Sequence, residues 1–157
     1  MGKKTVAIIG DTGEFCPALT KAAVQQDFRL LFISRDEQRY SALKEQLGIP
    51  EQTAEIEFIT CEKEGCWEAD VIAFTDTMVV DPGLLKRIKQ VATQKIVLVI
   101  SHEPVEPLNL NFRELLPHSK VVDLRLKDKE FVTLGRNEEA NKTVRNFFVA
   151  AGYHQKS

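Results

Sequence analysis

Short runs of apolar residues recur along the chain at the length of buried strands. Residues 5–9, 28–33, 70–75 and 96–100 form such runs, whereas residues 55–60 alternate between apolar and polar positions. Continuous apolar runs are typical of parallel strands that are covered on both faces, and the alternating segment predicts a shorter outer strand. The pattern therefore predicts a parallel sheet between two layers.

Helical spacing of apolar residues separates these runs. Residues 14–27 have one apolar side, and so does a second segment that follows residue 36 and ends at Gly48. Asp81 and Pro82 are suited to an N-cap and a first helical position, and they open a third helix. Strands and helices that alternate over short connections predict a doubly wound sheet of the Rossmann type.

The pattern changes after residue 104. A short helix is predicted near residues 111–116, and two strands at 120–126 and 130–134 are joined by residues 127–129 alone, which forces an antiparallel pair. A last helix begins at Asn137 and ends at Gly152. We expect one α/β domain over residues 1–157: a Rossmann-type, doubly wound, mostly parallel sheet with a C-terminal antiparallel edge hairpin and a closing helix.

Composition narrows the classes of partner. A net charge of −2 provides no basic stripe for nucleic acid, so we expect no nucleic-acid partner. The apolar runs are far shorter than the roughly 20 residues that cross a bilayer, and no signal-peptide core precedes the first strand, so we expect no membrane partner and a cytoplasmic protein. Three cysteines without paired spacing favour neither a disulfide framework nor a metal site. Cys61 and Cys66 are expected to be reduced thiols near a loop, with a redox pair as the alternative.

The first strand runs into a turn that contains Gly10 and Gly13 and then into a helix. Glycine lets the backbone turn tightly and approach a ligand closely, and the amide groups of the following helix would point at a phosphate. The pattern Gly-x-x-Gly-x-x-Cys keeps two of the three glycines of a nucleotide-binding turn. The alternative is a strand-to-helix turn that binds nothing.

In such a sheet a ligand lies across the carboxyl ends of the strands, at the switch point between the first and fourth strands. Where enzymes that use NAD place an acid after the second strand, this chain has Ser34 and Arg35, with Arg39 one helical turn further on. Because arginine forms charge-assisted bonds to phosphate oxygens, we predict NADP(H) as the cofactor; a solvated arginine is the alternative. The candidate cofactor-binding residues are Gly10, Asp11, Thr12, Gly13, Glu14, Phe15, Ser34, Arg35, Arg39, Thr75, Asp76, Thr77, Ser101 and His102.

Five segments together resemble the NADP-dependent oxidoreductases that act with the deazaflavin coenzyme, and the related reductase domains of the six-transmembrane metalloreductases. They are VAIIGDTGEFC (6–16), SR (34–35), ADVIA (69–73), LPHSKVV (116–122) and LGRNEEA (134–140). The resemblance covers most of the chain and implies hydride transfer between NADP(H) and a small acceptor such as a flavin or deazaflavin. It also implies that the glycine turn holds the pyrophosphate and that Thr12, Ser34 and Arg35 hold the 2′-phosphate, while Arg39 matches a later basic position.

The chain also departs from that family. Asp11 replaces a small neutral residue, Cys16 replaces a helix-packing glycine, and Glu14 adds a negative charge near the expected pyrophosphate. The segment between the last two strands is shorter than in the family. Two alternatives therefore stay open: a catalytically inactive nucleotide-sensing or interaction module, and an enzyme whose acceptor site is completed in a homodimer that pairs through the edge hairpin.

No catalytic residue is assigned from the sequence. Hydride transfer depends mainly on holding the nicotinamide against its acceptor, and it does not require a nucleophile or an acid–base pair. His102 follows the fifth predicted strand, where an imidazole could exchange a proton with the acceptor; an exposed loop histidine is the alternative.

Overall fold

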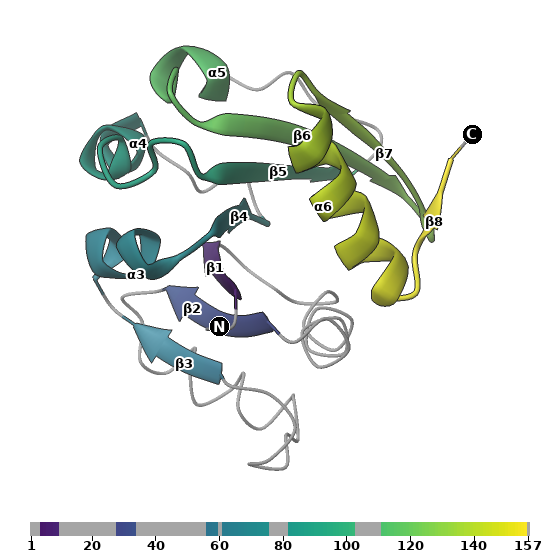
Figure 1. Ribbon diagram of the computed structural model, residues 1–157, viewed down its shortest axis with the longest axis horizontal. Helices are drawn as coiled ribbons and strands as arrows, with labels where there is room; N and C mark the ends of the chain where they lie inside the picture. The colour runs from purple at the N-terminus through teal and green to yellow at the C-terminus, as the bar shows by residue number, and fades with distance from the viewer. Residues whose placement is uncertain are drawn as a thin grey trace.

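The computed structural model describes residues 4–9, 28–33, 56–59, 61–75, 82–102 and 111–156, and these contain one eight-stranded sheet (Figure 1). The strands are β1 (Lys4–Ile9), β2 (Phe28–Ile33), β3 (Ile56–Ile59), β4 (Val71–Phe74), β5 (Ile96–His102), β6 (Lys120–Lys127), β7 (Glu130–Gly135) and β8 (His154–Gln155). Their spatial order is β3-β2-β1-β4-β5-β6-β7-β8. The first six strands in this order are parallel to their neighbours, whereas β7 is antiparallel to β6. The predicted Rossmann-type sheet is confirmed, with β3 as the outer strand.

Helices cover both faces of this sheet (Figure 1). They are α3 (Glu62–Glu68), α4 (Pro82–Ile88), α5 (Phe112–Leu115) and α6 (Glu138–Ala150). Alternate residues of each strand point to opposite faces, so Val6 and Ile8 join the apolar cluster under α6, whereas Ala7 and Ile9 join the cluster under α3 and α4. The predicted helices in residues 14–27 and after residue 36 lie outside the described residues.

Helix α6 begins and ends where the sequence predicts. The side chain of Asn137 accepts a hydrogen bond from the Ala140 N–H at 2.9 Å, which is the N-cap arrangement. Gly152 has a φ of 96°, a conformation that glycine adopts without strain, and the Tyr153 N–H then donates to the Phe148 carbonyl at 3.0 Å. The apolar side of the helix is buried against the sheet: Ala140, Val144, Phe147, Phe148 and Ala151.

The sequence pattern does not predict helix α3, and it leads us to expect Cys61 and Cys66 near a loop. Cys61 precedes this helix and is exposed, whereas Cys66 lies within it and is buried. Gly65 allows α3 to approach the end of β2, because a Cβ at this position would lie 2.5 Å from Cδ1 of Ile33. Cys66 therefore lies within a helix, close to its C-terminal end at Glu68.

The sequence pattern does not predict strand β8 either, which lies beside the predicted edge hairpin. The His154 N–H donates to the Lys129 carbonyl at 2.7 Å, and the Lys156 N–H donates to the Phe131 carbonyl at 2.8 Å. At the other end of β7, the Asn141 side-chain amide donates to the Gly135 carbonyl at 2.9 Å. The carbonyls of Lys129, Phe131 and Gly135 thus already accept hydrogen bonds within the chain, and a homodimer that pairs through this hairpin could not use them.

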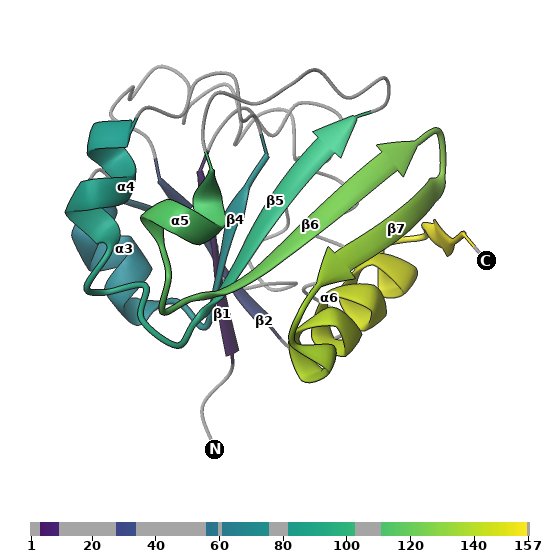
Figure 2. The ribbon, with the colours of Figure 1, turned by 90° about the horizontal axis from the view of Figure 1, so that it is seen from above.

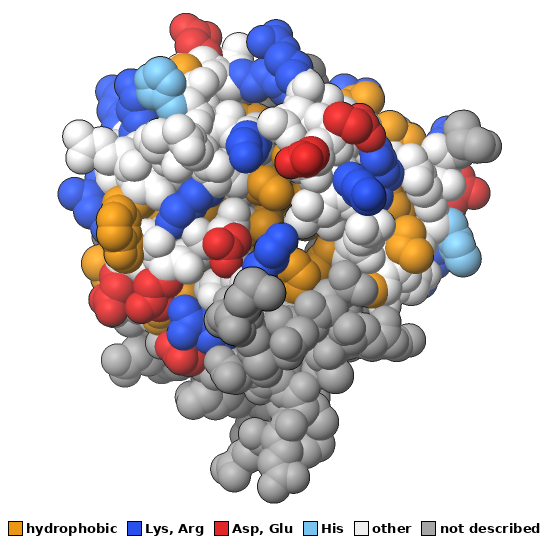
Figure 3. Space-filling view, in the orientation of Figure 1, with side chains coloured by type: hydrophobic (Ala, Val, Ile, Leu, Met, Phe, Trp, Pro, Cys, Tyr) orange, Lys and Arg blue, Asp and Glu red, His pale blue; other side chains and the backbone are white. Residues whose placement is uncertain are grey.

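The described surface mixes charges of both signs, as one face shows (Figure 3). Several of these charges are paired, for example Arg87 with Glu62 at 3.0 Å. Within the described ranges, no group of three metal-ligating side chains comes together. No helix in the described part of the chain is both long and apolar enough to cross a membrane.

Candidate functional site

The carboxyl ends of β1, β2 and β4 lie side by side. Ile9, the last residue of β1, is in register with Ile33 at the end of β2 and with Phe74 at the end of β4. Neighbouring strands are about 4.8 Å apart, so the chain leaves these three strands within about 10 Å. Because β2 and β4 flank β1, this is the predicted switch point, and the chain continues from it into residues 10–15, 34–39 and 75–78, where the sequence predicts the site.

Thr75 spans the gap between β1 and β4 at this point. The residue is 4% exposed, and its backbone N–H donates to the Ile9 carbonyl at 3.1 Å. Its hydroxyl group donates to the same carbonyl at 3.4 Å. Thr75 was predicted to contact the cofactor, and the structure shows that its hydroxyl holds the end of β1 directly before Gly10.

Ser101 and His102 end β5 at the same edge of the sheet, where Figure 2 shows the arrowheads of β5 and β6 side by side. Ser101 is half-buried and is in register with Arg125 of β6, while His102 is in register with Leu126. The other predicted site residues lie outside the described residues: Gly10, Asp11, Thr12, Gly13, Glu14, Phe15, Ser34, Arg35, Arg39, Asp76 and Thr77. Arg125 was not predicted as a site residue, because only the pairing of β6 with β5 brings it to this edge.

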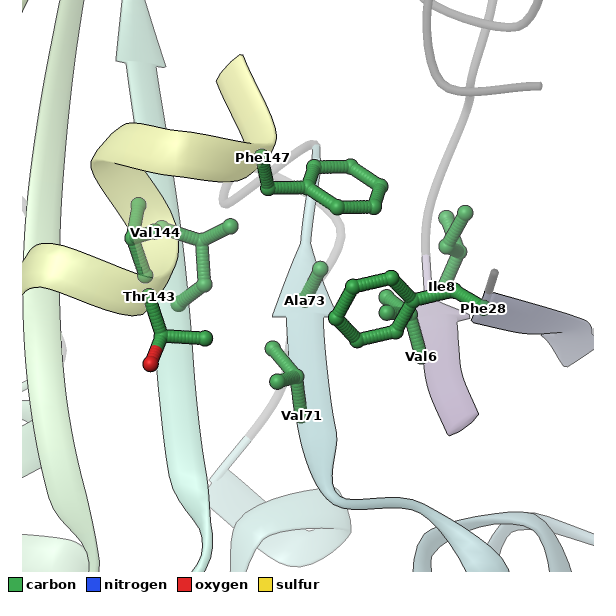
Figure 4. A pocket seen from close by; sticks show the side chains of 9 residues that line it. Val6, Ile8, Phe28, Val71, Ala73, Thr143, Val144 and Phe147 are labelled. Atoms are coloured by element: carbon green, nitrogen blue, oxygen red, sulfur yellow. The ribbon is translucent and has the colours of Figure 1, made fainter. Parts of the chain in front are cut away.

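A separate apolar pocket lies between α6 and the sheet (Figure 4). It contains about 360 Å³ of empty space, part of it open to solvent. Its described lining residues are Val6, Ile8, Phe28, Val71, Ala73, Leu98, Thr143, Val144 and Phe147. The polar group among them, the Thr143 hydroxyl, donates to the Glu139 carbonyl at 3.0 Å. This lining offers no charged group to a phosphate, so the pocket differs in kind from the site at the carboxyl ends of the strands.

The two described thiols differ in their environments. Burial raises the pKa of Cys66 to about 12, although the nearby Lys95 charge acts in the opposite direction. Cys61 is exposed, and neither thiol is in a disulfide. The buried thiol is therefore protonated at neutral pH and is a poor nucleophile.

We expect iodoacetamide to alkylate Cys61 and to spare Cys66 in the folded protein at pH 8. Burial excludes the reagent from Cys66, and its raised pKa leaves almost no thiolate. Peptide mapping by mass spectrometry would measure both sites. Labelling in denaturant is the control, and there both sites should react; equal labelling of the folded protein would contradict the prediction.

Three solved structures share this fold over nearly the whole chain. The NADP-bound pyrroline carboxylate reductase of Plasmodium falciparum matches with a TM-score of 0.64 at 14% identity, over 100% of this chain and 59% of that chain. A putative F420-dependent NADP reductase from Arthrobacter sp. matches with a TM-score of 0.67 at 13% identity, over 96% of this chain and 82% of that chain. The NDP-N-acetyl-D-galactosaminuronic acid dehydrogenase of Methanosarcina mazei matches with a TM-score of 0.71 at 10% identity, over 99% and 43%.

These structures are similar in fold and distant in sequence. No model of a protein family matches the chain, and no curated protein matches it either. The chain spans 59% of the length of the Plasmodium falciparum reductase, so that protein has further residues without a counterpart here. The comparisons establish that this chain has the Rossmann-type fold found in these reductases and in the dehydrogenase.

Proposed function

We propose that the chain binds NADP(H) across the carboxyl ends of β1, β2 and β4 and transfers hydride between this cofactor and a small flavin-like acceptor. One observation carries the proposal. The register of Ile9 with Ile33 means that the glycine turn and the Ser34–Arg35 pair start from neighbouring strands at the switch point. A dinucleotide phosphate needs these two kinds of group side by side.

Each part of the proposed site has a chemical task. Gly10 and Gly13 let the backbone approach the pyrophosphate, and the helix that follows would add its amide groups. Ser34 and Arg35 would bind the 2′-phosphate, with Arg39 in support. Bound NADPH would supply the hydride, and the protein would hold the nicotinamide at the β4–β6 side of the site.

The solved structures support the choice of cofactor. One of them holds NADP, and another is described as an F420-dependent NADP reductase, which favours NADP(H) here and a deazaflavin or flavin as acceptor. The short turn between β6 and β7 leaves less chain for an acceptor site than the deazaflavin-linked family has. A small acceptor therefore suits this chain best.

Replacing Arg35 by alanine is expected to weaken NADPH binding about ten- to a hundredfold. A charge-assisted hydrogen bond to phosphate contributes roughly 1.5–3 kcal/mol, and this variant removes it. NADH lacks the 2′-phosphate, so its affinity should stay unchanged and the preference for NADPH should largely vanish. Isothermal titration calorimetry of both cofactors would measure the change.

The control for this experiment is Lys44→Ala, which removes a positive charge that the helical spacing places away from the cofactor. The Arg35 effect should also shrink as salt rises, because the contact is partly exposed. Equal affinity of the unmodified protein for NADH and NADPH would refute the 2′-phosphate site.

A second candidate function is a nucleotide-sensing or interaction module without catalysis. Asp11 and Glu14 favour it, because their carboxylates fall within the turn that would approach the pyrophosphate. The two functions differ in one measurement. A sensor would bind NADPH and would leave the absorbance at 340 nm unchanged in the presence of FMN or a deazaflavin, whereas the oxidoreductase would consume NADPH.

A further inference from the structure

Arg125 stands at the carboxyl edge of the sheet, on the half that follows the switch point. It is in register with Ser101 of β5, and adjacent strands are about 4.8 Å apart. Residues two apart in a strand share a face, and Val121 of β6 belongs to the apolar cluster under α4 and α5. Arg125 therefore lies on that same face, beside a predicted site residue.

The charge of Arg125 is not balanced by the described residues around it. Ion pairs hold four other arginines: Arg29, Arg87, Arg113 and Arg145. Arg125 is exposed and forms no such pair within the described residues. Asp123, which shares its face, already binds Nη1 of Arg113 at 2.7 Å. Its direct neighbours on the flanking strands, Ser101 and Val132, are uncharged.

Two further charged side chains on this face stand opposite each other. Lys127 follows Arg125 by two residues and is in register with Glu130 of β7. Opposite charges at directly facing positions stabilise a strand pair. Glu130 is therefore placed to face Lys127 rather than Arg125. Because no carboxylate of the described residues forms an ion pair with Arg125, its guanidinium is available to an anion.

This place in the fold corresponds to the acceptor side of a dinucleotide site. In a sheet of this order each half takes one nucleotide, and the glycine turn and Ser34–Arg35 belong to the β1–β3 half. The nicotinamide then falls to the β4–β6 half, and its hydride acceptor must lie against it. We propose that Arg125 is a specificity-determining residue that binds a phosphate or carboxylate group of the hydride acceptor, an inference that rests on the proposed function.

A pair of flavins isolates this interaction. FMN and riboflavin have the same isoalloxazine ring, and FMN alone carries a phosphate. NADPH transfers hydride to N5 of the ring and a proton from solvent goes to N1, which yields NADP⁺ and the reduced flavin in both cases. Any difference between the two acceptors therefore reports on binding of the phosphate.

The unmodified protein is expected to have a lower KM for FMN than for riboflavin. Arg125→Gln should raise the KM for FMN about tenfold, because one charge-assisted contact is lost at a partly exposed site. The KM for riboflavin and the dissociation constant of NADPH should not change. Arg125→Lys keeps the charge and loses the planar fork, so its KM for FMN should fall between those of the other two proteins.

Arg136→Gln is the matched control. Arg136 is also an exposed arginine, but it follows β7, whose end at Gly135 is in register with Val122 near the start of β6. It therefore lies toward the opposite edge of the sheet. This variant loses the same charge and should keep the KM values of the unmodified protein for both flavins.

Binding supplies a second measurement that does not depend on turnover. Quenching of flavin fluorescence in the presence of NADP⁺ gives the dissociation constants of FMN and riboflavin, and Arg125→Gln should weaken FMN alone. The inference is overturned if the unmodified protein binds both flavins equally, if Arg125→Gln leaves FMN unaffected, or if Arg136→Gln has the same effect. Failure to bind NADPH at all would instead refute the proposed function.

Discussion

Replacing Gly13 by valine is expected to lower NADPH affinity by about two orders of magnitude or more, because at least two charge-assisted hydrogen bonds of roughly 1.5–3 kcal/mol each would be lost. Gly13 is the fourth residue after Ile9, where β1 ends at the switch point. A branched side chain there would occupy the space of the pyrophosphate. The prediction concerns a residue outside the described ranges, and it follows from the sequence together with the strand end that precedes it.

The Gly13→Val protein should remain folded, since the described residues alone form an apolar cluster on each face of the sheet. Circular dichroism and the thermal midpoint would establish this before NADPH is titrated by calorimetry. Gly13→Ala gives a graded comparison, with a smaller loss of affinity. A folded Gly13→Val protein that binds NADPH as tightly as the unmodified chain would place the cofactor elsewhere.

Truncating Phe148 to alanine is expected to lower the free energy of unfolding by about 3–5 kcal/mol. The side chain is fully buried, and its ring lies 5.8 Å from that of Phe131 and 5.5 Å from that of Tyr153, measured between ring centroids. These contacts join α6 to β7 and to the segment that leads into β8. Removing the ring leaves a cavity where three elements meet, so equilibrium unfolding in urea should show a lower midpoint.

Val149→Ala is the matched control for this experiment. Val149 is the next residue of the same helix and is 55% exposed. Its truncation should change the free energy of unfolding by less than about 0.5 kcal/mol. Similar losses from the two variants would mean that α6 does not pack on the sheet through Phe148.

Strong local signals account for the elements that the sequence predicts. Continuous apolar runs mark β1, β2, β4 and β5, and the cap residues Asn137 and Gly152 mark the ends of α6. Helix α3 has no comparable signal, because its seven residues include Gly65 and too few apolar residues to make an apolar side. It is held by tertiary contacts, with Gly65 against Ile33 and Glu62 paired with Arg87. Strand β8 likewise depends on distant backbone partners in β7.

The candidate site likewise has parts that the sequence predicts and parts that only the structure shows. The glycine turn is one continuous segment of the sequence and the Ser34–Arg35 pair is another, so each can be recognised without a structure. The contact of Thr75 with the Ile9 carbonyl and the alignment of Ser101 with Arg125 join residues that are far apart in the chain. These groups come together only through the register of neighbouring strands, and the pattern of apolar residues does not reveal that register.

Strand β8 limits how this sheet can grow. An open strand is a template on which a foreign segment can add a further strand, and proteins with long unprotected outer strands are prone to fibre formation. In β7 the Phe131 carbonyl already serves β8, and the Gly135 carbonyl serves the side chain of Asn141. An incoming segment would find few consecutive backbone partners between them, so this side of the sheet is protected against templated extension.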